Sequence, residues 1–174
     1  MESTMTDGYP FIFQMVDRSE SDGYLIETMQ YRFKSKKSHH TYIVRVECYE
    51  EHAYCVKFFD KANINSQNKF SLRSNTFEAR TILYTMFHIM LDVLKRDDKA
   101  SFFFIGAEDE KDQKGMMSRR FRLYRRFVLS TVSEEKFDHY RRNELSLYIL
   151  VNKNTVDDTR IYAERIADIV QQYL

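Results

Sequence analysis

Apolar and polar residues alternate over much of the first sixty positions, a pattern typical of strands that bury one face. These stretches are rich in Tyr, Phe, Ile and Val, which favour extended structure. We expect four strands, at 10–16, 24–33, 41–50 and 52–59. The join around Glu51 and His52 is short enough for a hairpin with a two-residue loop. The N-terminal half is therefore predicted to be a strand meander.

Apolar residues at helical spacing predict a long helix in the middle of the chain. Asn75 is a good N-cap, and Glu78 three residues later completes a capping-box pattern. The apolar arc covers more than half of the helix, at Ile82, Leu83, Met86, Ile89, Met90, Val93 and Leu94. The polar strip is narrow and holds Glu78, Thr81, Thr85, His88 and Asp92. We therefore expect this helix to pack across a face of the sheet.

Two more strands and one more helix are expected in the second half. The apolar run SFFFIG (101–106) fits a strand buried on both faces, and ELSLYILV (144–151) fits another. Thr155 and Asp158 open a last amphipathic helix. Its inner side is predicted to carry Ile161, Ile166, Ile169, Val170 and Tyr173.

Strands that precede helices favour an α+β fold. We expect a largely antiparallel sheet with an N-terminal strand meander, packed against a long central helix, with two further helices. A chain of 174 residues fits a single domain over 1–174, with 1–9 as a flexible N-terminus. The apolar fraction of 43% and the charged fraction of 30% are typical of a globular protein.

Composition argues against several classes of function. The chain has four glycines and no glycine-rich run before a helix, so a phosphate-binding loop is not expected. It has no HExxH, CxxC or zinc spacing, and we expect no metal and no cofactor. No apolar run is long enough to cross a membrane, and the first residues do not resemble a signal peptide. Cys48 and Cys55 are therefore expected to be reduced in the cytoplasm.

The densest charge lies in residues 119–126, which hold five arginines in a chain of net charge +1. Ser118 is a plausible N-cap for a helix there. On a helical wheel Arg119, Arg122, Arg125 and Arg126 lie opposite an apolar arc formed by Phe121, Leu123, Tyr124, Phe127 and Val128. Arg120 falls within that arc, so its guanidinium needs an internal carboxylate, a route to solvent or an anionic ligand.

A second basic segment, residues 31–74, carries nine basic and four acidic residues. Its strands also hold several aromatic residues: Tyr31, Phe33, Tyr42, Tyr49, Tyr54 and Phe58. Exposed aromatics beside basic residues are typical of RNA-binding sheets, which stack bases on them. The same aromatics also suit a core, and both interpretations stay open.

A strand meander, a helix opened by Asn75, SFFFIG, a loop and Arg120-Phe-Arg122-Leu123-Tyr124 follow one another over roughly 24–151. This order resembles an uncharacterised bacterial domain family, in which a strand ending in Gly is followed by a loop and an R-x-R-L-Y motif. The resemblance implies a fold and an anion-friendly corner at Arg120, Arg122 and Tyr124. It implies no activity, because the family has no settled function.

The candidate anion-binding or nucleic-acid-binding residues are Arg119, Arg120, Arg122, Tyr124, Arg125 and Arg126. Our first hypothesis is a small non-enzymatic binding or regulatory protein that contacts an anionic partner, nucleic acid first, through this helix. A protein-interaction module of a bacterial toxin or defence assembly, with an acidic partner, is the alternative. An enzyme acting on a phosphorylated substrate is the second alternative, with Arg120 as anion clamp and Tyr124 or His88 as proton donor. A plain solvated helix face also explains the arginines, and the sequence specifies neither a catalytic residue nor an oligomeric state.

Overall fold

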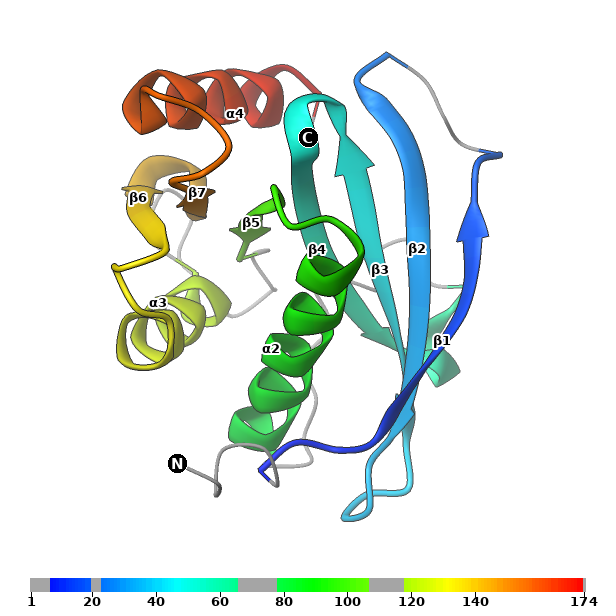
Figure 1. Ribbon diagram of the computed structural model, residues 1–174. Helices are drawn as coiled ribbons and strands as arrows, with labels where there is room; N and C mark the ends of the chain where they lie inside the picture. Colours follow the sequence, from blue (N-terminus) through cyan, green and yellow to red (C-terminus); the bar gives the residue numbers. More distant parts are fainter. Residues whose placement is uncertain (1–6, 20–22, 66–77, 107–117, 174) are drawn as a thin grey trace. The chain divides into compact units, whose positions relative to one another are not determined.

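The computed structural model describes residues 7–19, 23–65, 78–106 and 118–173 (Figure 1). These residues form seven strands in one sheet, in the order β1-β2-β3-β4-β5-β7-β6, and three helices. The strands are β1 (Phe11–Asp17), β2 (Leu25–Lys34), β3 (Thr41–Tyr49), β4 (Ala53–Asp60), β5 (Ser101–Ile105), β6 (Phe137–Arg142) and β7 (Leu147–Asn152). Strands β1–β2, β2–β3, β5–β7 and β6–β7 pair antiparallel, whereas β4 and β5 pair parallel. The predicted α+β fold, with its N-terminal meander and largely antiparallel sheet, is confirmed.

The described residues divide into two compact units, and the first comprises Met1–Glu50 and Val56–Asp98. Here α2 (Ala79–Arg96) lies across one face of the β1–β3 meander (Figure 1). Tyr31 is fully buried under it, and its hydroxyl donates to Asp92 of α2 at 2.7 Å. Phe33 and Tyr42 stack beside it with ring centroids 5.1 Å apart. An aromatic core thus joins the long helix to the meander.

The start of α2 differs from the predicted capping box. Asn75 lies outside the described residues, and the helix begins at Ala79 with Glu78 at the N-cap position and no side-chain cap hydrogen bond. The Glu78 side chain is buried and accepts hydrogen bonds from four hydroxyls, those of Tyr9, Ser35, Ser38 and Tyr42. A carboxylate at a helix N-terminus is favoured by the helix dipole, and here the hydroxyls replace its lost water. Tertiary hydrogen bonds therefore displaced the local cap.

The segment before β1 is described from residue 7 onward. Tyr9 is buried, its amide donates to the Thr85 hydroxyl at 2.8 Å, and Thr85 itself is fully buried. Thr85 and Glu78, both expected on a polar strip of α2, therefore hold this end of the chain. Flexibility of residues 1–9 and a single domain over 1–174 stay predictions.

The connection between β3 and β4 is longer than the predicted two-residue loop. It is a 3-10 turn over Glu50–His52, in which Glu51 and His52 both have positive φ, 62° and 63°. The Glu51 carbonyl accepts from the Tyr162 hydroxyl at 2.8 Å, and its carboxylate meets Arg165 at 2.6 Å. Contacts with the last helix therefore shape this turn.

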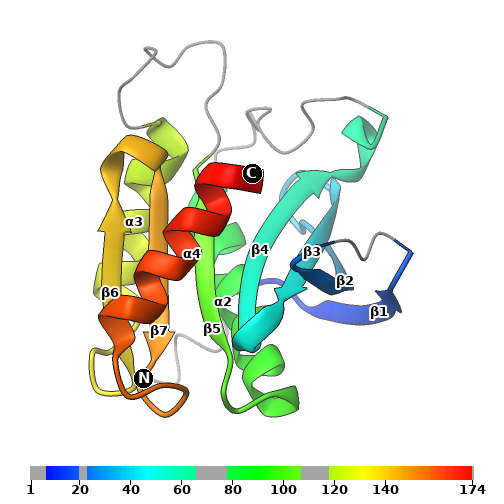
Figure 2. The same ribbon diagram turned by 90° about the horizontal axis from the view of Figure 1, so that it is seen from above.

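The second unit comprises Glu51–Cys55 and Lys99–Leu174. In it α3 (Arg119–Thr131) and α4 (Thr159–Tyr173) lie on opposite faces of the β6–β7 pair, as both views show (Figures 1 and 2). Strand β5 is buried over most of its length, as predicted for SFFFIG. Strand β6 was not predicted from the sequence.

Two elements of this unit are placed differently from their predictions. Strand β7 begins at Leu147, because Asn143–Leu145 form a 3-10 turn and Ser146 takes a left-handed φ of 49°. In α4, Ile166 and Val170 are buried as predicted, but Ile161 is 52% exposed. Tyr162 is buried in its place, since its hydroxyl reaches the Glu51 carbonyl.

Candidate anion-binding helix

Hydrogen bonds fix the start of α3. The Ser118 hydroxyl accepts from the Phe121 amide at 3.0 Å and donates to the Gly106 carbonyl, with an oxygen–oxygen distance of 2.5 Å. The Ser118 amide donates to the Ser146 hydroxyl at 3.4 Å, and the Gly106 amide donates to the Ser146 carbonyl at 2.9 Å. The predicted N-cap at Ser118 is confirmed, and it ties α3 to the end of β5 and the start of β7.

Gly106 allows the helix to approach the sheet this closely. A Cβ atom built on Gly106 would lie 2.5 Å from the N, Cα and Cβ atoms of Phe121. Real Cβ atoms essentially never approach other heavy atoms below 3.0 Å. Because Phe121 is fully buried in the first turn of α3, only glycine fits at position 106 without a shift of the helix.

The exposed side of α3 carries three of the predicted arginines. The helix packs through Phe121 and Val128, the two residues of it that are buried. Arg119, Arg122 and Arg126 are exposed, and Arg125 is half-buried at the edge. Its first turn has no acidic residue. The predicted polar face is therefore present, with its positive charge gathered in the N-terminal half of the helix.

Two leucines border this arginine face. Leu123 is 39% exposed and Leu129 is 51% exposed. Leu123 was predicted to belong to the apolar arc, and that prediction is wrong. The arc on the wheel is wider than the strip that touches the sheet, so residues at its rim remain at the surface.

Arg120 and Tyr124 lie at the other margin of the buried strip, and both are half-buried. The Tyr124 ring packs edge-on against Phe104 of β5, with ring centroids 6.3 Å apart. Burial raises the pKa of Tyr124, and the positive charge and hydrogen bond of Arg120 oppose that rise. Arg120 therefore interacts with the phenol one turn further along its own helix, and the Tyr124 ring packs α3 against β5.

A half-buried histidine pairs with a buried tyrosine between β6 and β7. His139 Nδ1 and the Tyr148 hydroxyl are 2.6 Å apart. Burial raises the pKa of Tyr148 to about 12, against the positive charges of Arg141 and Arg125. Burial also lowers the pKa of His139, although Glu134 and the carbonyls of Val132 and Ser133 favour the charged ring. Arg125 of α3 and Arg141 of β6 thus lie near one phenol.

His139 Nε2 is buried and makes no hydrogen bond of ordinary geometry within the described part of the chain.

The second basic segment, residues 31–74, differs from α3 because part of its positive charge is neutralised by acidic residues of the strands. Arg45 pairs with Asp17 at 3.2 Å, and Lys57 pairs with Glu47 at 2.9 Å. Hydrogen bonds from Ser19, together with Arg45, lower the pKa of Asp17 to about 2. Five of the six aromatics proposed for base stacking, Tyr31, Phe33, Tyr42, Tyr49 and Tyr54, are buried, and Phe58 is half-buried. The five buried rings belong to the core and are not exposed for base stacking.

Sequence reasoning missed the role of β6, which carries Arg141 and Arg142. Neither was assigned a place from the sequence, because the strand was not recognised. Successive residues of a strand point to opposite faces, so Arg141 lies on the α3 side and Arg142 on the α4 side of the sheet. The two adjacent arginines were the sequence signal that could have pointed to these charged positions.

Over the described ranges, no three His, Cys, Asp or Glu side chains come together as metal ligands would. None of the helices described is both long enough and apolar enough to span a bilayer. Searches with protein-family models, against curated proteins and against solved structures returned no match. The resemblance to a bacterial domain family therefore stays a prediction, as does a cytoplasmic location.

Proposed function

We propose that this protein is a small non-enzymatic binding or regulatory protein that contacts nucleic acid through the exposed face of α3. The observation that carries the proposal is the position of Arg119, Arg122 and Arg126. They are exposed on successive turns of one helix whose first turn has no acidic residue.

The electrostatics of α3 support an anionic partner. The N-terminus of a helix carries a partial positive charge, so cations there are unfavourable and anions are favourable. Arg119, Arg120 and Arg122, in the first turn of α3, work against this field in the unbound protein. A phosphate backbone bound at this end would be attracted by the positive charge of the guanidinium groups and by the helix dipole.

Nucleic acid suits the spacing of the exposed arginines. Side chains three and four residues apart lie one above another along a helix, about 5–6 Å apart at their Cβ atoms. A row of arginines at 119, 122 and 126 can therefore follow a run of phosphates. Such contacts fix position on a backbone and carry no base specificity by themselves.

The test is fluorescence anisotropy with labelled single-stranded RNA, single-stranded DNA and duplex DNA over a salt series. The variant combines Arg119→Glu, Arg122→Glu and Arg126→Glu. We expect wild-type affinity to fall with salt, and the variant to reduce the log–log slope by about two to three, because each lost phosphate contact removes roughly 0.7–0.9. The substitutions leave the buried residues Phe121 and Val128 in place.

A matched control changes the same amount of charge elsewhere. Arg18, Arg32 and Lys34 are exposed in the first unit, and replacing all three by Glu gives the same change in net charge. This control is expected to keep most of the affinity. An equal loss of affinity in both variants would mean that the binding depends only on the overall charge of the chain. No binding of any of the three nucleic acids at low salt would remove the proposal.

An acidic protein partner is the second candidate, and the exposed leucines favour it. Leu123 and Leu129 border the arginine face, and apolar side chains among arginines are typical of protein interfaces. Leu129→Ser leaves the charge unchanged, so a nucleic-acid surface should keep its RNA affinity in this variant. Competition with polyglutamate and with heparin adds a second test: polyglutamate that displaces RNA as well as heparin does would favour the acidic partner.

A further inference from the structure

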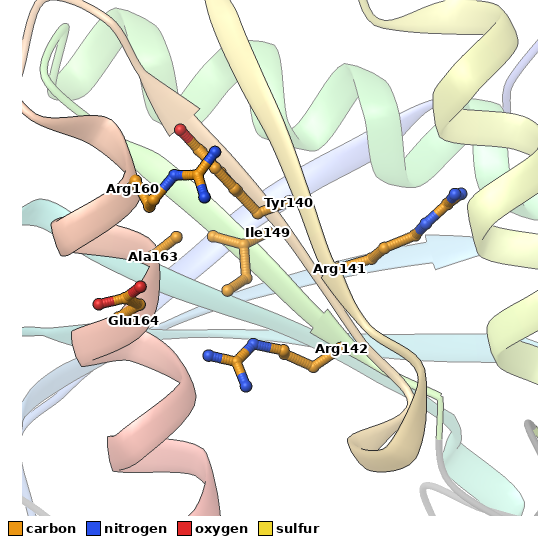
Figure 3. Close-up of a pocket in the computed structure, with 7 residues that line it drawn as sticks. All are labelled: Tyr140, Arg141, Arg142, Ile149, Arg160, Ala163 and Glu164. Atoms are coloured by element: carbon orange, nitrogen blue, oxygen red, sulfur yellow. The ribbon is translucent and has the colours of Figure 1, made fainter.

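A hollow of about 220 Å³ lies between β6 and α4, on the face of the β6–β7 pair opposite α3 (Figure 3). Ile149 of β7 and Ala163 of α4 are both buried and supply apolar surface to it. The polar lining comes from Tyr140, Arg141 and Arg142 of β6, and from Arg160 and Glu164 of α4. The Arg141 side chain points away from α4 (Figure 3). None of these lining residues lies on α3.

Two arginines from different elements extend into the space between β6 and α4. Figure 3 shows Arg142 pointing from the end of β6 toward α4, and Arg160 pointing from the first turn of α4 toward β6. Arg160 makes no ion pair with any described residue. Arg142 has one ion pair, to Glu144 at 3.6 Å, in which both side chains are about half exposed or more, 47% and 65%. Such exposed pairs are weak, so both guanidinium groups remain available to a ligand.

Arg160 and Glu164 stand one helical turn apart, where an ion pair would be geometrically accessible. They form none, and Glu164 has no ion pair to another described residue. Both side chains line the hollow. The pocket therefore offers two cationic donors and, beside them, an anionic acceptor.

Tyr140 adds a second acceptor. The Thr159 hydroxyl donates to Asp138 Oδ2 at 2.6 Å, and the Tyr140 and Thr159 hydroxyls are 2.6 Å apart. Since Thr159 has a single proton and gives it to Asp138, Tyr140 must donate its own proton to Thr159. The phenol oxygen of Tyr140 then has only lone pairs left to offer. A ligand that uses Tyr140 and Glu164 has to bring hydrogen-bond donors.

The size of the hollow restricts the ligand. Pockets for drug-sized molecules hold roughly 300–1,000 Å³, so this one suits an anionic group with a few attached atoms. Two planar guanidinium forks on opposite sides suit a tetrahedral anion, which presents oxygens in several directions. Arg142, Arg160 and Glu164 together carry a net charge of +1, so a doubly charged group gains more net attraction than a single carboxylate does.

We propose that the hollow between β6 and α4 binds phosphate monoesters that carry hydroxyl groups close to the phosphate, such as sugar phosphates. Arg142 and Arg160 hold the phosphate oxygens. Glu164 and the Tyr140 oxygen accept from the ligand hydroxyls. The site goes beyond the nucleic-acid surface of α3 and does not depend on it.

The experiment is a titration followed by the NMR signals of the arginine Nε–H groups and the backbone amides of β6 and α4. The probes are glycerol 3-phosphate, methyl phosphate, inorganic phosphate and glycerate. We expect saturable shifts at Arg142 and Arg160, with glycerol 3-phosphate the tightest and glycerate at least tenfold weaker. Methyl phosphate has the same charge as glycerol 3-phosphate but no hydroxyl. The difference between the two affinities therefore measures the contribution of the acceptors Tyr140 and Glu164.

Matched variants locate the site. Arg142→Gln and Arg160→Gln are each expected to weaken glycerol 3-phosphate at least tenfold. Arg141→Gln removes the same charge from the neighbouring residue, whose side chain points away from α4 in Figure 3, and should change the affinity less than twofold. Glu164→Gln is expected to tighten inorganic phosphate and to reduce the advantage of glycerol 3-phosphate over methyl phosphate.

Several outcomes would overturn the proposal. Equal weakening by the Arg141, Arg142 and Arg160 variants would indicate general attraction to positive charge. Glycerate as tight as glycerol 3-phosphate would reject a phosphate site, and equal binding of methyl phosphate would reject the hydroxyl contacts. The α3 triple variant has an intact hollow, so its loss of RNA affinity with retained phosphate binding separates the two proposals.

Discussion

Gly106→Ala adds one methyl group where β5 meets the first turn of α3. The new Cβ would lie 2.5 Å from three atoms of Phe121, two of them backbone atoms. A flexible side-chain tip could move aside at little cost, but the backbone of α3 has to shift as a whole. The shift would also stretch the hydrogen bond from the Ser118 hydroxyl to the Gly106 carbonyl.

The size of the effect follows from these two contributions. Overpacking a tight site costs about 1–3 kcal/mol, and a weakened hydrogen bond adds roughly 0.5–1.5 kcal/mol. We expect a loss of about 2–4 kcal/mol, which lowers Tm by about 5–15 °C in a chain of this size. Urea unfolding followed by circular dichroism measures the loss.

Hydrogen exchange shows where the loss acts. Amides of α3 should exchange faster in Gly106→Ala, because the helix separates from its anchor before the core unfolds. Gly23→Ala is the control: Gly23 has a φ of +55° and nothing within 4 Å of its added Cβ. It should cost about 1 kcal/mol from backbone strain alone, with α3 unchanged.

The reasoning would be refuted by a Gly106→Ala variant that loses no more stability than Gly23→Ala and keeps the α3 amides protected. That result would mean that the helix does not approach β5 as closely as described.

Three further predictions concern stability. Ser118→Ala should lower the free energy of unfolding by about 1–2 kcal/mol in urea titration, because it removes the N-cap and the donor to Gly106. Arg119→Glu should raise it by about 0.5–1 kcal/mol at low salt, since an anion replaces a cation at the helix start, and the gain should shrink as salt is added. The lowered pKa of His139 means that the unfolded chain binds more protons, so stability should fall as pH drops below the unfolded value of 6.5. His139→Gln should flatten that slope in denaturation curves measured across this range.

Much of this fold could be predicted because its signals are local. Ser118 is a good N-cap by chemistry alone, and it caps α3. The run SFFFIG is apolar enough to indicate a strand buried on both faces. Strand β6 lacks such a signal: FDHYRR has one apolar residue at its start and pairs only with β7 as an edge strand. Its extended structure depends on pairing with β7. The alternation of apolar and polar residues in its own sequence does not indicate a strand.

The candidate sites were harder to predict because tertiary contacts choose among local options. Glu78 has the spacing of a capping-box residue, yet four hydroxyls hold its carboxylate, and they come from the N-terminal segment, the connection after β2 and strand β3. The sequence correctly marked Arg120 as unusual but did not show its interaction with Tyr124. The position of Tyr124 depends on how α3 packs against Phe104 of β5. A helical wheel shows how wide the apolar arc of α3 is. Which part of that arc is buried depends on how the helix packs against the sheet.

The two proposed sites separate because a β-strand alternates its faces. Arg141 and Arg142 are neighbours in sequence, but one lies on the side of α3 and the other on the side of α4. Their side chains therefore point to opposite faces of the sheet, although any count along the chain adds their charges together. A basic segment read as one surface would predict that both arginines matter to every anion. The strand instead implies that Arg142→Gln affects small phosphate esters and that changes on α3 affect nucleic acid, so binding data from single variants can assign each anion to one face.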